Sequence, residues 1–143
     1  MRMRLRRKSD KRSLMKRAVR DFELARRYGE AKEYVTESVL YQKAAEKILR
    51  ALSMRHAKKL PKDASLGYLA KKARIPESIY GDLVEMPDER SEMIEEEERL
   101  SFMDMEKEED QNRVLESTER SHAMTKRNVV KRLMDYAMAS TNL

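Results

Sequence analysis

The stretch from Tyr34 to Leu52 places the strongest limits on the fold, because apolar and small residues recur there at alternating steps of four and three. This stripe consists of Tyr34, Ser38, Tyr41, Ala45, Ile48 and Leu52. Such spacing puts all of these side chains on one face of an α-helix. The face is widened beyond a coiled-coil seam by Val35, Ala44, Leu49 and Ala51. The sequence therefore predicts a central and largely buried helix.

Glycine and proline mark the expected ends of the other elements. The chain has only 3 Gly and 3 Pro, too few for the many turns of an all-β fold. One helix is predicted from Ser13 to Tyr28 on the recurrence of Leu14, Ala18, Phe22 and Ala25, with Gly29 as the residue that ends it. Two short helices should follow the central one. The first is capped by Asp63 or Ser65 and the second opened by Pro76, with Pro61 and Pro87 as stops.

The chain beyond Pro87 contains neither Gly nor Pro. An apolar stripe lapses over residues 107–112 and resumes with Val114, Leu115, Met124, Val130, Leu133 and Ala137. This pattern favours two helices with a turn near residues 109–112, and one long helix is the alternative. The whole pattern predicts an all-α fold, a four- to five-helix up-down bundle with a long central helix.

The net charge of +6 is confined to the first twelve residues, which hold seven bases and one acid. We expect residues 1–12 to form a disordered basic arm before a single domain over residues 13–143. Such an arm suits an anionic partner, either a phosphate backbone or an acidic protein surface. The candidates for contact with nucleic acid are Arg2, Arg4, Arg6, Arg7 and Lys8, together with Lys126 and Arg127 on the last helix.

Several classes of protein are disfavoured. Cysteine is absent, so no disulfide or thiolate site forms, and no apolar run approaches the ~18 residues of a membrane span. We therefore expect a cytoplasmic protein without a membrane partner. The sequence contains no glycine-rich phosphate loop and no nucleophile elbow, so we expect neither a cofactor nor a serine nucleophile. No metal site is expected either, because the two His lie far apart and the consecutive acids after residue 94 point in different directions on a helix.

Three segments follow one another along the chain: Ala18-Val-Arg-Asp-Phe-Glu-Leu-Ala25, Tyr41-Gln-Lys-Ala-Ala-Glu-Lys-Ile-Leu-Arg-Ala-Leu52 and Asp63-Ala-Ser-Leu-Gly-Tyr-Leu69. In this order they resemble the HEPN family of small helical bundles. Glu46 and Lys47 stand where the family motif has a Glu-Lys pair, and Asp21 is placed to face them from the preceding helix. The resemblance implies a bundle that is often a homodimer. It also implies a protein that binds or cuts RNA, or that pairs with a nucleotidyltransferase in a toxin–antitoxin module.

The ribonucleases of this family carry an Arg, a polar residue and then a His four to six places on. Here Arg127 and Asn128 match the start of that motif, but no His follows. His122 lies only two residues after Arg120, on a different side of a helix. Arg120, His122, Arg127 and Asn128 are thus weak candidates for a catalytic set.

The sequence favours a non-catalytic or degenerate HEPN-like protein that binds RNA or a nucleotidyltransferase-type partner. Two alternatives stay open. One is a ribonuclease with an atypical Arg/His site, and the other is a structural module that assembles with itself through its acidic and basic helices.

Overall fold

The computed structural model describes residues 2–57, 59–86 and 108–140, and side chains over 10–57, 59–86 and 111–140. The helices are α1 (Arg2–Glu30), α2 (Tyr34–Ser53), α3 (Leu66–Ala73), α4 (Glu77–Val84) and α6 (Glu108–Ser140). No strand occurs in these ranges, so the predicted all-α helical fold is confirmed. Nor does any helix in them combine the length and the apolar character that crossing a membrane requires.

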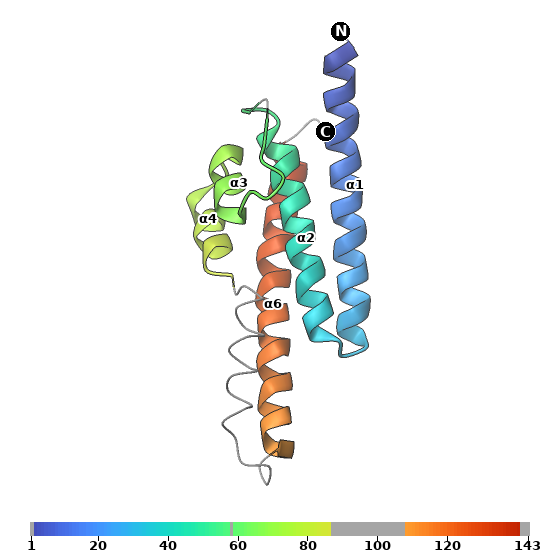
Figure 1. Cartoon of the computed structure of the whole chain (residues 1–143), viewed down its shortest axis with the longest axis vertical. Coiled ribbons are helices and arrows are strands. Elements are labelled where there is room, and N and C mark those ends of the chain that lie inside the picture. The colour runs from blue at the N-terminus through green and yellow to red at the C-terminus, as the bar shows by residue number, and fades with distance from the viewer. Residues whose placement is uncertain (1, 58, 87–107, 141–143) are drawn as a thin grey trace.

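Helix α2 lies at the centre, with α1 on one side, α6 on another and the short α3 and α4 on the side away from α1 (Figure 1). Its predicted stripe is buried from Ser38 to Leu52, and Tyr41, Ala45 and Ile48 have no exposed surface. Helix α1 contributes Met15, Ala18, Phe22 and Ala25 to the core. The rings of Phe22 and Tyr41 meet with centroids 5.2 Å apart, which joins the two helices.

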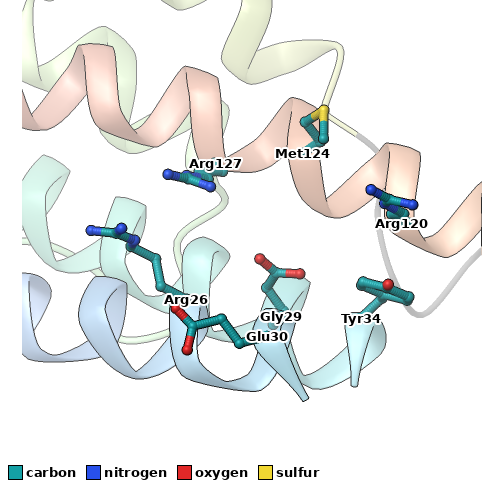
Figure 2. A pocket seen from close by; sticks show the side chains of 8 residues that line it. Arg26, Gly29, Glu30, Tyr34, Arg120, Met124 and Arg127 are labelled. Carbon is teal, nitrogen blue, oxygen red and sulfur yellow. The ribbon is translucent and has the colours of Figure 1, made fainter. Parts of the chain in front are cut away.

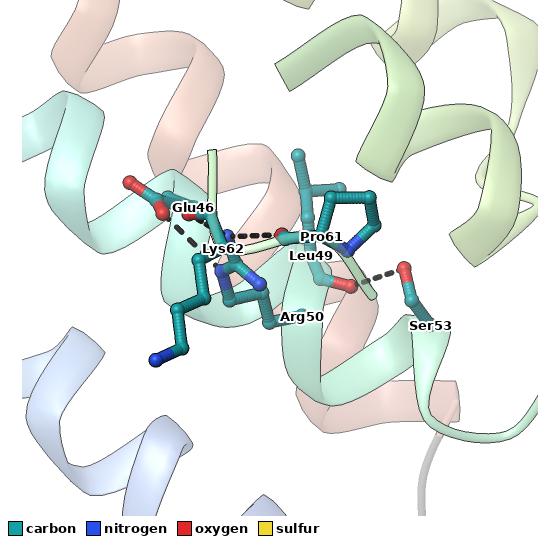
Figure 3. Close-up of polar contacts among 6 residues, drawn as sticks. All are labelled: Glu46, Leu49, Arg50, Ser53, Pro61 and Lys62. Carbon is teal, nitrogen blue, oxygen red and sulfur yellow. Dashed lines mark hydrogen bonds and ion pairs between the residues drawn. The ribbon is translucent and has the colours of Figure 1, made fainter. Parts of the chain in front are cut away.

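Polar contacts hold both α3 and the loop before it against the end of α2. Figure 3 shows those of Arg50 with the loop and of Ser53 with Leu49. The Arg50 guanidinium donates to the carbonyl oxygens of Pro61 and Lys62 at 3.0 and 2.8 Å, while its Nε donates to Glu46 at 3.2 Å. The buried Ser53 hydroxyl lies 2.6 Å from the Leu49 carbonyl oxygen and 3.0 Å from that of Leu69 in α3. The contacts of Arg50 fix the loop between α2 and α3, and the contact of Ser53 with Leu69 fixes α3 itself.

Both short helices begin where the sequence predicted. Ser65 is the N-cap of α3, and its side chain accepts a hydrogen bond from the Tyr68 amide at 3.1 Å. Pro76 is the N-cap of α4, which starts at Glu77. The predicted stop at Pro87 lies outside the described residues.

Helix α1 differs from its prediction at both ends. It begins at Arg2 rather than near Ser13, so residues 2–12, predicted as a disordered arm, lie within the helix. It ends at Glu30, and Lys32 rather than Gly29 takes the left-handed conformation, with φ 62°. The Lys32 amide donates to the Gly29 carbonyl and the Glu33 amide to the Tyr28 carbonyl, a Schellman pair that closes the helix.

Helix α6 is continuous through residues 109–112, so the turn predicted there is wrong. The segment before it lies outside the described residues. The buried face of α6 matches the predicted stripe at Val130, Leu133 and Ala137. It differs elsewhere, because Val114 and Met124 are exposed while Ala123 and Val129 are buried.

Candidate functional site: an arginine pocket between α1, α2 and α6

A pocket of about 230 Å³ opens where the end of α1 and the start of α2 face α6. It is lined by Arg26, Gly29, Glu30, Tyr34, Glu37, Arg120, Met124 and Arg127. The α1–α2 turn brings the first five residues together, and α6 supplies the last three. Two segments almost 90 residues apart in the chain therefore build one site.

Three arginines define the chemistry of this pocket. Arg120 and Arg127 are seven residues apart, two turns of α6, so they project from the same face. In Figure 2, Arg127 and Arg26 lie at one end of the pocket, and Arg120 lies at the other end beside Tyr34. All three arginines are exposed side chains, so a ligand can reach their guanidinium groups from solvent.

A buried carboxyl group lies among these cations. Glu37 is 7% exposed, and its Oε2 accepts a hydrogen bond from the Tyr41 hydroxyl at 3.0 Å. Burial raises the pKa of Glu37, and this effect exceeds the opposing influence of the Tyr41 hydrogen bond and of the Arg127 charge. Burial also raises the pKa of Tyr41, helped by the neighbouring Glu37 charge, so Tyr41 stays protonated and keeps donating.

The arrangement suits an anion that also carries a planar group. Guanidinium groups bind phosphate oxygens through paired N–H donors, and Tyr34 offers a ring on which a base can stack. Besides the arginines, the ionisable groups of the lining are Glu30, Tyr34 and Glu37. Across the described ranges no three His, Asp or Glu side chains gather as a metal site would require.

The sequence model of the HEPN domain matches residues 12–137, which is most of the chain. The chain belongs to the HEPN family. The fold predicted from the resemblance and the family itself are thus confirmed, and membership associates the chain with nucleotide-related or ribonuclease-like functions. No curated protein and no solved structure matches it.

Only part of the suggested Arg/His set meets in this HEPN protein. Arg120 and Arg127 both line the pocket, whereas His122 and Asn128 do not. His122 is two residues beyond Arg120, a rotation of about 200° around the helix, so its side chain leaves on another side of α6. The lining of the pocket therefore contains both candidate arginines, Arg120 and Arg127, but no histidine.

Lys126 differs from its prediction as a nucleic-acid contact. Its side chain has no exposed surface, and its Nζ lies 3.4 Å from Gln42 Oε1 on α2. This burial and the contact with Gln42 show that Lys126 points inward, towards α2. It belongs to the packing between α2 and α6 rather than to a binding surface.

The family-motif residues join α1 to α2. Asp21 and Lys47 form an ion pair across the two helices, while Glu46 pairs with Arg50 within α2 at 3.2 Å. None of these residues lines the pocket. Among the basic residues of the predicted arm, Arg2, Arg4, Arg6, Arg7 and Lys8 occupy the first turns of α1, and their binding of nucleic acid stays a prediction.

Sequence reasoning missed Arg26, Tyr34 and Glu37 as site residues. Arg26 is one of many bases on α1, and Tyr34 was assigned only to the apolar stripe. Of these three residues, only Glu37 could have been recognised as unusual from the sequence. It is adjacent to Ser38 on the buried side of a helix, where a charged residue is rare unless it is paired. That position predicts a partnered carboxyl group, but it does not reveal the arginines of α6.

Proposed function

We propose that this HEPN protein binds single-stranded RNA by its phosphate groups at the arginine pocket and does not cleave it through the usual Arg/His pair. The observation that carries the proposal is the convergence of Arg26, Arg120 and Arg127 from two helices on one pocket. The three arginines outnumber the two carboxyl groups of the lining, those of Glu30 and Glu37, so the pocket keeps an excess of positive charge that an anion can neutralise.

The other lining residues support RNA over a simple inorganic anion. Tyr34 lies beside Arg120, so a base and its phosphate can be held at the same end of the pocket (Figure 2). Single strands expose these groups, whereas duplexes hide the bases.

Cleavage by the usual route requires an imidazole that moves a proton at the bound phosphate. No histidine belongs to the lining of the pocket. RNA bound at Arg120 and Arg127 therefore lacks the group that the ribonucleases of the family place there. This supports binding without turnover.

The test is binding of a fluorescently labelled single-stranded RNA to the purified full chain at about 50 and 200 mM salt. Affinity should fall with salt, since each phosphate contact displaces a counterion and adds about 0.7 to the slope of log affinity against log salt. Arg127→Gln should weaken binding and lower that slope. Lys43→Gln, which removes an exposed cation of α2 outside the pocket, is the matched control.

Binding that ignores salt, or that Arg127→Gln and Lys43→Gln weaken equally, would reject the proposal. The same samples, analysed on a gel after incubation, test the absence of cleavage. RNA fragments produced by the wild-type chain and lost in His122→Ala would instead establish an atypical Arg/His ribonuclease.

A further inference from the structure

Helix α1 carries a line of exposed bases outside the arginine pocket. We call these four exposed residues the α1 stripe: Arg12, Lys16, Arg20 and Arg27. Steps of four, four and seven residues put them on one side of the helix. Arg20 is two positions, or about 200° of rotation, from the buried Phe22, whose ring contacts Tyr41 of α2. The stripe therefore lies on the solvent-exposed side of α1, opposite the side that packs in the core.

The cations of the stripe have no protein partner in the part of the chain that the structure describes. No ion pair, side-chain hydrogen bond or ring contact joins any of the four to another described residue. Glu23, an exposed acid between Arg20 and Arg27, forms no such pair either. Four bases and this one acid leave an excess of positive charge, which an anion can neutralise.

The stripe begins where the arginine pocket ends. Arg26 lines the pocket, and Arg27 is the next residue of α1, turned about 100° further around the helix. A ligand that leaves the pocket past Arg26 therefore reaches Arg27 first and Arg20 two turns later. From Arg27 to Arg12 the stripe covers 15 positions of one unbroken helix, about 23 Å at 1.5 Å per residue.

A line of cations suits a linear polyanion better than a small anion. Neighbouring bases of the stripe are about 6 Å or more apart along the helix axis, so a single phosphate ion cannot neutralise all of them. A stacked nucleic-acid strand carries one charge per nucleotide and advances about 3.4 Å with each. About seven nucleotides would therefore cover the whole stripe.

We propose that the α1 stripe binds the phosphate backbone of a single RNA strand where that strand leaves the arginine pocket. The inference rests on the RNA binding proposed above, to which it adds a second surface and a minimum length. A strand that occupies the pocket and also covers the stripe has about eight nucleotides or more. Contact with the stripe raises affinity by effective concentration, without any new contact in the pocket.

The experiment measures how labelled uridine oligonucleotides of about 4 and 12 nucleotides bind the full chain, by fluorescence anisotropy at several salt concentrations. The wild-type chain should bind the longer at least about tenfold more tightly. Lys16→Gln/Arg20→Gln should remove most of this gain. It should also lower the salt slope for the longer oligonucleotide by about 1.4, which is about 0.7 for each lost phosphate contact. The shorter oligonucleotide should bind this variant as it binds wild type.

The matched control is Lys71→Gln/Lys72→Gln, which removes the same charge from exposed positions of α3. Helix α3 lies on the side of α2 away from α1 (Figure 1). The control therefore corrects for the general loss of positive charge, because it leaves the stripe intact. Glutamine has nearly the helix propensity of lysine and arginine, and thermal unfolding checks that both variants fold.

The outcomes separate the two proposals. If the shorter oligonucleotide binds, but the stripe variant and the control bind the longer one equally well, the stripe proposal falls and the pocket proposal stands. If neither oligonucleotide binds wild type, both proposals fall. The stripe proposal is also overturned if the substitutions in the stripe leave RNA binding unchanged but abolish self-association in sedimentation velocity, since the stripe would then bind an acidic surface of a second copy.

Discussion

The carboxyl group of Glu37 packs directly on the backbone of Gly29. A Cβ atom added at Gly29 would lie 2.6 Å from Cδ of Glu37 and 2.7 Å from its Oε1, closer than real Cβ atoms approach. Gly29 does not have positive φ, so its lack of a side chain serves close approach rather than a turn. The end of α1 and the buried acid of the arginine pocket are therefore one packing unit.

Gly29→Ala should lower the free energy of unfolding by about 1–2 kcal/mol, because the added methyl group must displace a carboxyl group that Tyr41 and burial hold in place. Chemical denaturation measures this difference. The control is Gly81→Ala in α4, where nothing lies within 4 Å of the added Cβ and stability should rise by about 0.5–1 kcal/mol. Equal gains for the two variants would show that Glu37 does not rest on Gly29.

Glu37→Gln should change how stability depends on pH. A carboxyl group whose pKa is raised by folding contributes stability below its ordinary pKa, and this contribution is lost as pH rises through the raised value. The wild-type chain should therefore lose stability relative to Glu37→Gln between about pH 4 and pH 8. Urea denaturation of both chains at these two pH values tests this, and a constant difference would contradict a raised pKa.

The same substitution should strengthen RNA binding at neutral pH. Removing one negative charge from beside three arginines favours an anionic ligand, and we expect a gain of roughly three- to tenfold in affinity for a short oligonucleotide. Fluorescence anisotropy at about 50 mM salt measures it. A loss of affinity would instead mean that the Glu37 carboxylate accepts a hydrogen bond from the RNA that Gln does not replace.

Ser53→Ala should cost about 0.5–1.5 kcal/mol of stability, because the buried hydroxyl group bridges towards the Leu49 and Leu69 carbonyl oxygens. The loss should appear as faster hydrogen exchange of the α3 amides, since Leu69 is the contact of Ser53 on that helix. Ser117→Ala, at an exposed position of α6, should stay within about 0.5 kcal/mol of wild type. An equal effect of both substitutions would reject the bridging role of Ser53.

The central part of the fold could be predicted from the sequence because it depends on local periodicity. The stripe from Tyr34 to Leu52 produces the buried face of α2, and Ser65 caps α3 as its position before an apolar run suggests. Both features depend on residues within a few turns of one another. Local spacing and capping chemistry therefore suffice to find them.

The errors arose where distant contacts decide the structure. Lys126 is buried against Gln42, although spacing alone placed it with the exposed bases. Met124, an apolar residue expected in the core, is 53% exposed and lines the pocket. A helix with several apolar and basic positions has more than one possible buried face, and only its partner, here α2, selects among them.

The candidate site was predicted only in its α6 half. Arg120 and Arg127 were found by comparison with the Arg/His motif of the family, but their neighbours Arg26 and Glu37 lie some 90 residues earlier in the chain. The pairing of those two segments depends on the turn at Lys32, which sets the direction in which α2 leaves α1. Nothing in the local sequence specifies that direction.

Helix α2 runs without a break from Tyr34 in the arginine pocket to Ser53 at its contact with α3. The separation of the pocket from that contact is therefore set by the number of residues in one stiff rod, and it does not change when loops or neighbouring helices shift. In this sense α2 works as a molecular ruler. One residue inserted near its middle would lengthen the rod by about 1.5 Å and turn the pocket end by about 100° relative to the end that contacts α3, which would take either Glu37 or Ser53 off the buried face of α2.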